Sequence, residues 1–224
     1  MKEFKLIIKN NFNEYLLSQK FIEYSKGRTY IKLCENQIIQ YVTFDRKDID
    51  NAILVSFGVD CLFRKKTLAW SKKVILPSIG SRIGYFTPSH SENRWFEIQP
   101  EASFIKSKET ILKIFEESLF PWFNEHTSIK KILEATNEPL FRQPDEGWNL
   151  YEQIFLELRL NQIEKAKIDL NSLLKNFDYL PAETISYCKE LISSMNNGSL
   201  DIQSLLMEIT AENIKSLRVE KFIN

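Results

Sequence analysis

The spacing of the apolar residues changes near Ser103, and this change constrains the fold more than any other feature of the chain. Before it, apolar and polar residues alternate over several short runs, as they do in strands that turn one face to a core. After it, apolar residues recur every three to four positions, which is typical of amphipathic helices. A chain that places its strands first and most of its helices afterwards is expected to form an α+β fold.

Five β-rich runs predict an antiparallel meander sheet of about five strands, because short turn-forming segments separate most of them. The runs cover residues 29–34, 38–45, 53–63, 81–86 and 94–98. In the third run every second residue from Ile53 to Phe63 is apolar, so we expect this face of the strand to point into the core. An amphipathic helix over residues 3–19 precedes the sheet.

The helical part of the sequence is divided by a segment rich in turn-forming residues. A helix from about Ser103 is expected to cover one side of the sheet, and Pro121 is expected to kink or end it near Phe120. Residues 137–147 contain two prolines and a glycine, and four helical stretches with short breaks follow them. We therefore predict an α+β sheet domain over 1–136, a linker at 137–147, and a small all-α helical bundle domain over 148–224.

Length, cysteine usage and hydropathy limit the class of protein. With 224 residues, 43% of them apolar, the chain can bury one large core or two small ones. Its three cysteines are far apart and in no metal-ligand spacing, which favours a reducing compartment. No window approaches the 18 or so apolar residues of a membrane span, and charged residues interrupt the N-terminal apolar stretch. We expect a cytoplasmic protein that does not enter membranes.

Residues for the common catalytic chemistries are scarce. Both histidines, His90 and His126, are expected on the surface, and neither a nucleophile elbow nor a glycine-rich phosphate loop occurs. Four aspartates near the ends of the second and third strands suggest a site for a hard metal: Asp45, Asp48, Asp50 and Asp60. Ordinary turn composition at residues 48–51 explains the cluster better. We predict no cofactor and no metal, and the sequence favours a protein that is not an enzyme.

Basic and aromatic side chains on or near the predicted sheet form the candidate binding set. It comprises Arg28, Arg64, Lys65, Lys66, Trp70, Lys72, Lys73, Arg82 and Arg94. Positive charge beside aromatic surface can follow a phosphate backbone and stack bases, whereas the competing interpretation of residues 64–73 is a solvated loop. If Arg28, Arg82 and Arg94 instead converge in one pocket, arginine forks holding a small anionic ligand are a third alternative.

A resemblance to a known family covers about residues 1–125. It rests on Lys26-Gly27-Arg28-Thr29-Tyr30 after the opening helix, then on the strand at 38–45, on Ser81-Arg82-Ile83-Gly84, and on Arg94-Trp95-Phe96-Glu97-Ile98. Together these segments resemble the bacterial domain-of-unknown-function family 4304. The resemblance implies a bacterial protein with an α+β domain, and it carries no activity, catalytic residue or cofactor.

The formal net charge of zero conceals an uneven distribution. Residues 1–100 carry 16 Lys and Arg against 10 Asp and Glu, so their net charge is +6, while residues 101–145 carry −2 and residues 146–224 carry −4. The sequence favours a non-enzymatic protein-interaction module of the accessory or immunity type, whose partner is another protein. The alternative is a nucleic-acid-binding or nucleic-acid-processing protein that uses the basic residues of the sheet domain.

Overall fold

The computed structural model describes residues 2–47, 51–68, 75, 77–91, 94–99, 101–143 and 145–220. It has an antiparallel sheet followed by helices, so the predicted α+β fold is confirmed. The chain forms two compact units. Residues 1–34, 39–59 and 80–127 make the first, which we call the sheet unit, and residues 35–38, 60–79 and 128–224 make the second, the helical unit.

The sheet has the strand order β1-β2-β3-β4-β5, and β6 also pairs with β4. Its strands are β1 (Ile22–Ser25), β2 (Thr29–Cys34), β3 (Ile38–Lys47), β4 (Ala52–Cys61), β5 (Ile79–Arg82) and β6 (Phe96–Glu97). The face of β4 predicted to point into the core is buried along its whole length, from Ile53 to Cys61. β1 was not among the predicted runs, and the fourth and fifth runs form shorter strands than predicted.

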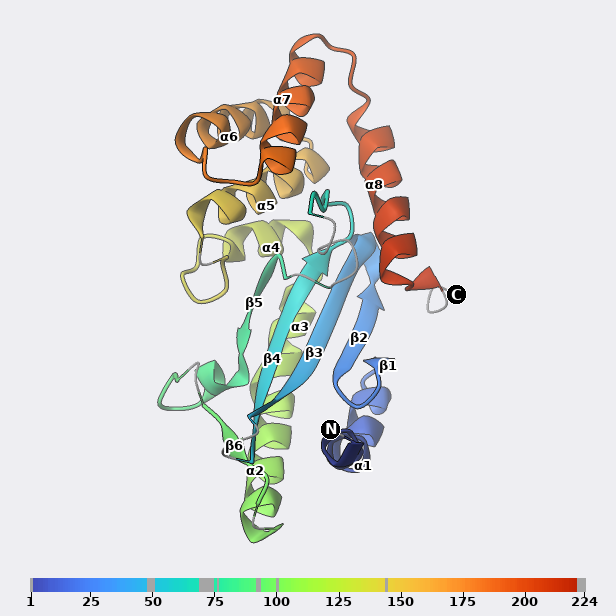
Figure 1. The fold of residues 1–224 in the computed structure, drawn as a ribbon, viewed down its shortest axis with the longest axis vertical. Coiled ribbons are helices and arrows are strands. Elements are labelled where there is room, and N and C mark those ends of the chain that lie inside the picture. The colour runs from blue at the N-terminus through green and yellow to red at the C-terminus, as the bar shows by residue number, and fades with distance from the viewer. Residues whose placement is uncertain are drawn as a thin grey trace. The chain divides into compact units, whose positions relative to one another are not determined.

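Helices cover one face of this sheet, as the sequence predicts. They are α1 (Lys2–Ser18), α2 (Glu101–Ile114) and α3 (Phe120–Glu125), and Figure 1 shows α3 behind the arrows of β3 and β4, with α2 extending past them beside β6. The ring of Phe12 in α1 lies 5.1 Å from that of Phe44 in β3, and Trp122 in α3 lies 4.9 Å from Phe57 in β4. Aromatic side chains therefore fill the core between the helices and the sheet.

Pro121 does not end the helix near Phe120, which is one of the two outcomes that the sequence predicts. A single π-helical turn, Phe115–Leu119, joins α2 to α3, and the N–H of Phe120 bonds to the carbonyl of Phe115. Proline has no N–H to donate to the carbonyl four residues earlier, and the wider turn directly before Pro121 lets the helix continue. His126, at the end of α3, is buried rather than exposed, because it stacks on Trp122 at 4.2 Å.

A 3-10 turn, Ile83–Phe86, replaces the last four residues of the predicted fourth strand. A Cβ atom on Gly84 would lie 2.1 Å from the carbonyl oxygen of Ser91 and 2.7 Å from Cβ of Arg94. Ser91 and Arg94 therefore pack so closely on this turn that only glycine fits at position 84.

The helical unit contains α4 (Ile129–Ala135), α5 (Glu146–Arg159), α6 (Ile163–Asn176), α7 (Ala182–Asn196) and α8 (Ile202–Leu217). The predicted C-terminal helices and their short breaks are therefore present. The division of the chain differs from the predicted one, since residues 60–79 and 128–147 also belong to this unit. None of the described helices is long and apolar enough to cross a membrane.

Candidate functional site

Four charged side chains are buried together in the helical unit. Asp60 accepts from Arg64 Nη2 at 3.2 Å and from Lys66 Nζ at 2.9 Å, while Arg64 Nη1 lies 2.5 Å from a carboxylate oxygen of Glu152. All four side chains are at most 5% exposed. We call this set, Asp60, Arg64, Lys66 and Glu152, the buried ion network. Its two cations pair with its two anions, as buried charges require.

Polar side chains from three helices hold the irregular backbone that carries this network. Asn213 in α8 donates to the carbonyls of Leu62 and Arg64, at 2.6 and 2.8 Å. Tyr151 in α5 donates to the carbonyl of Lys65 at 2.8 Å. The hydroxyls of Thr67 and of Thr184 in α7 lie 2.6 Å apart. The bonds from Asn213 and Tyr151 satisfy buried backbone carbonyls, and together with the bond between the two threonines they fix residues 62–67 in place.

The first turns of α5 place Trp148 and Glu152 beside the 62–67 segment. Asp145 caps the helix, because its carboxylate accepts from the backbone N–H of Trp148 at 2.9 Å. The hydroxyl of Tyr179 donates to the same carboxylate at 3.0 Å. Trp148 and Glu152 are four residues apart and therefore lie on one face of the helix. Fixing the first turn of α5 thus fixes the direction of both side chains.

A cavity of about 320 Å³ opens beside the network. Its walls come from the 62–67 segment, from Leu68 and Pro77, from the loop before α5, from α5 and from the N-cap residue of α7. They comprise Arg64, Lys65, Lys66, Thr67, Leu68, Pro77, Gln143, Trp148, Glu152 and Pro181. The side chain of Gln143 donates to the carbonyl of Pro77, which ties two of these walls together. All lining residues belong to the helical unit.

Burial shifts the proton equilibria of the network in a way that favours a functional role. Burial, partly offset by the Arg64 guanidinium, raises the pKa of Glu152 to about 7. Burial alone would lower the pKa of Arg64, but the carboxylates of Glu152 and Asp60 outweigh it and raise that pKa. Glu152 therefore exchanges a proton near neutral pH in a cavity wall, the property expected of a binding or proton-transferring carboxylate.

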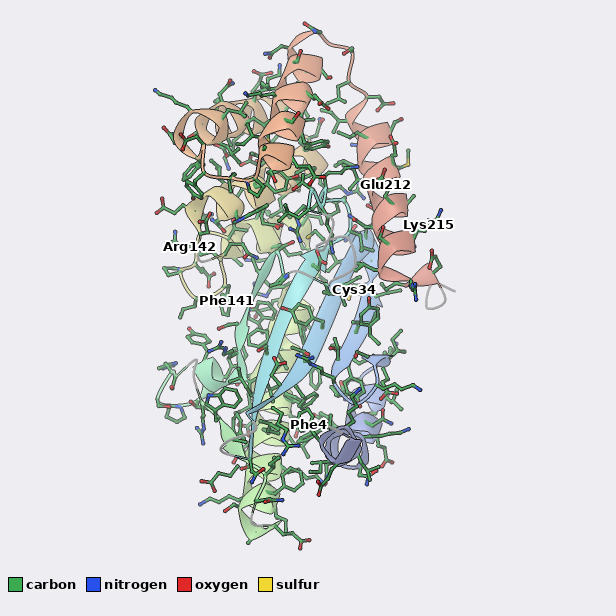
Figure 2. The ribbon with its side chains drawn as sticks, in the orientation of Figure 1. Phe4, Cys34, Phe141, Arg142, Glu212 and Lys215 are labelled. Carbon is green, nitrogen blue, oxygen red and sulfur yellow. The ribbon has the colours of Figure 1, made fainter. Side chains whose placement is uncertain are left out.

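The structure brings together some of the predicted binding residues. Arg64 and Lys66 meet in the buried ion network, while Lys65 turns away and pairs with Glu212 of α8 at 2.6 Å. Figure 2 labels Glu212 on α8. The solvated-loop interpretation therefore does not describe Arg64 and Lys66. The remaining basic and aromatic candidates of this stretch lie outside the described residues: Trp70, Lys72 and Lys73.

Arg28, Arg82 and Arg94 do not converge in a pocket. Arg28 lies in the turn between β1 and β2 and pairs with Asp45 at 2.5 Å, whereas Arg82 ends β5 at the other side of the sheet. Arg94 lies over the ring of Phe96, 5.2 Å from its centre. The alternative in which these three arginines hold a small anion is therefore wrong for the positions the structure describes.

Sequence reasoning missed Glu152, Trp148 and the role of Asp60. One signal for Glu152 was present: it follows Trp148 by four positions and precedes Leu156 by four, so a carboxylate sits in an apolar helical stripe. Asp60 likewise interrupts a strand that is apolar on both sides of it. A charge in such a position needs a buried partner, but the pattern does not say which cation supplies it.

Within the described ranges, no group of three or more His, Cys, Asp and Glu side chains is arranged to hold a metal ion. Cys34, Cys61 and Cys188, all of which the structure describes, are not joined by disulfide bonds. Comparison of the chain with protein-family models, curated proteins and solved structures gives no match. The resemblance to family 4304 therefore stays a prediction, and the site has to be interpreted from its own chemistry.

Proposed function

We propose that the helical unit binds a small organic molecule in the cavity beside the buried ion network. The observation that supports this is the composition of the cavity walls. Trp148, Leu68 and the prolines supply apolar surface, and Arg64, Lys66 and Glu152 supply a few polar groups at fixed positions. A cavity of a few hundred Å³ with this combination is the usual form of a small-molecule site.

The energetics of the network support the same proposal. Removing four charges from water costs free energy, and replacing a buried ion pair by apolar residues of the same size is often neutral or stabilising. The network is therefore a poor device for stability alone. Charged groups on a backbone segment that Asn213, Tyr151 and Thr184 hold in place are instead well suited to orient a ligand, because they lose little further freedom when it binds.

Ligand-observed NMR with a library of one-ring and two-ring compounds tests the proposal. We expect some of them to bind the whole protein, and Trp148→Ala to weaken this binding about tenfold, equal to about 1.4 kcal/mol. Trp148→Phe, which keeps a ring in the wall, is expected to bind more tightly than Trp148→Ala. Leu140→Ala is the matched control, because Leu140 is exposed in the same unit and does not line the cavity.

Two results would contradict the proposal. Either no compound of the library binds the folded protein, or those that bind do so equally well to Trp148→Ala. Backbone amide spectra of each variant show whether it is folded, so loss of binding through unfolding is recognised.

The functions favoured by sequence stay predictions. If the chain is a protein-interaction module, affinity capture at native expression levels is expected to recover a stoichiometric protein partner with it. Nucleic-acid binding would weaken steeply with salt, because each neutralised phosphate releases counterions. The described structure reduces the cations available for that alternative, since Arg64 and Lys66 are committed to buried carboxylates and Arg28 is paired. The cytoplasmic location also stays a prediction.

A further inference from the structure

The charges that line the cavity are not balanced. Two cations of the network, Arg64 and Lys66, line it together with a single carboxylate, that of Glu152, while Lys65, which also lines it, is paired with Glu212. Asp60 does not line the cavity and has both oxygens engaged, one by Arg64 and one by Lys66. The compensating negative charge thus lies behind the wall, and the surface presented to a ligand is more positive than the network as a whole. Such a surface attracts an anion.

Glu152 occupies the position on Arg64 that an acidic ligand would take. Its carboxylate lies 2.5 Å from Arg64 Nη1, and both residues line the cavity. A guanidinium matches the geometry of carboxylate and phosphate oxygens, so either can replace the glutamate on the same nitrogen. Asp60 keeps Arg64 in position during such an exchange through Nη2.

We infer that the cavity takes a small acid, a carboxylate or a phosphate on a flat ring, whose oxygens replace those of Glu152 on Arg64 while Glu152 takes up a proton from water. The ring lies against Trp148, and the acid lies at Arg64 with Lys66 beside it. This inference rests on the proposed function, because it names the chemistry of the ligand for the same cavity. No covalent bond of the ligand is broken: the carboxylate of Glu152 leaves Arg64 and takes up one proton from solvent, and the acid of the ligand takes its place.

The groups around Glu152 determine the pH dependence of this exchange. Residues 60–79 present Asp60, Arg64, Lys66 and Ser78 to it, and its own helix presents Tyr151. Since the pKa of Glu152 is about 7 before binding, an acid that displaces it from Arg64 raises that pKa further. Binding is therefore strongest below pH 7. Affinity falls about tenfold for each pH unit above it, until the pKa of the complex is reached.

Matched probes separate this inference from the proposed function. Naphthoate and phenyl phosphate are compared with their uncharged counterparts naphthamide and phenol, by calorimetry on the whole protein between about pH 6 and pH 9. We expect at least one acid to bind about tenfold more tightly than its counterpart. Its binding at about pH 8 should also take up close to one proton, measured from the dependence of the heat on the buffer. The tighter of the two acids identifies the acidic group.

Glu152→Gln is the decisive variant, because it removes the competing charge and keeps the shape. It is expected to bind the acid at about pH 8 at least as tightly as the natural protein does at about pH 6, without proton uptake. Glu146→Gln is the matched control, since Glu146 is exposed in the first turn of the same helix and should leave the pH profile unchanged.

Each further outcome has a separate meaning. If acid and amide bind equally, the proposed cavity function holds and the inference of an acid is wrong. If the acids bind preferentially but with a flat pH profile, the exchange with Glu152 is wrong. If no probe and no compound of the wider library binds, the proposed function fails and the inference fails with it.

Discussion

The carboxylate of Glu152 makes the stability of the protein depend on pH in an uncommon direction. Its pKa is raised in the folded protein from 4.5 to about 7, so the protonated form is favoured by folding. A group of this kind contributes stability that is fully present below its unfolded pKa and is lost as the pH rises through its folded pKa. Relative to Glu152→Gln, the natural protein is expected to lose about 3 kcal/mol between pH 4.5 and about pH 7.

Urea unfolding of both proteins across this pH range measures the difference, and the other carboxylates cancel because both proteins share them. Glu146→Gln, with the same change of charge at an exposed position, should run parallel to the natural protein at every pH. A difference between Glu152→Gln and the natural protein that stays constant or grows with pH would show that Glu152 is ionised throughout.

Two neighbouring lysines offer a direct comparison of buried and exposed ion pairs. Lys66→Met leaves the carboxylate of Asp60 with one cation in a fully buried position, which is expected to cost about 3–5 kcal/mol of unfolding free energy. Lys65→Met removes a pair whose glutamate is half exposed, and it should cost less than about 1 kcal/mol. Equal costs, measured by urea unfolding at one pH, would mean that the network contributes no more than a surface pair.

The 62–67 segment depends on helix α8 for its backbone hydrogen bonds. In Asn213→Leu the carbonyls of Leu62 and Arg64 lose their donor, and each unsatisfied buried carbonyl costs about 1–3 kcal/mol. We therefore expect a loss of about 2–5 kcal/mol by urea unfolding, together with faster amide exchange in residues 62–67. Lys215→Leu on the same helix (Figure 2) is the control, and its exposed position predicts a change within about 0.5 kcal/mol. Unchanged exchange in Asn213→Leu would mean that α8 does not hold the segment.

The spacing of apolar residues predicts helices and strands that bury one regular face. It does not predict segments whose backbone hydrogen-bond partners are far away in the sequence. The helices and the longer strands β2, β3 and β4 follow from the sequence because each repeats one spacing over many residues. β1 has four residues, all half-buried, and β6 has two, so neither shows an alternation long enough to recognise. Residues 62–67 have no period at all. Their conformation depends on Tyr151 and Asn213, which are far away in the chain.

The candidate site shows the same limit across the whole chain. Sequence patterning singled out Arg64 and Lys66 as a basic patch, but it placed the domain boundary at 137–147 and so separated them from Glu152. Arg64 pairs with two carboxylates, and that of Glu152 is 88 positions away, a separation that no local pattern specifies. Composition also placed the basic residues in the sheet domain, whereas the structure assigns residues 60–79 to the helical unit. Because residues 60–79 belong to the helical unit, Arg64 and Lys66 lie beside Glu152 and line the same cavity.

The helical unit takes residues 60–79 from the middle of the sheet-forming part of the chain. We therefore predict that the C-terminal helices do not fold independently of these residues. A fragment of residues 148–224 retains most of the helices of the unit, but it contains Glu152 without Arg64, and Tyr151 and Asn213 without the carbonyls they bind. It is expected to keep helical circular dichroism while it loses cooperative unfolding and side-chain NMR dispersion. A second fragment that joins residues 60–79 by a flexible linker to 128–224 restores these partners and should regain a cooperative transition. If the unfolding transition of the shorter fragment is as cooperative as that of the longer one, residues 60–79 do not contribute to the core of the helical unit.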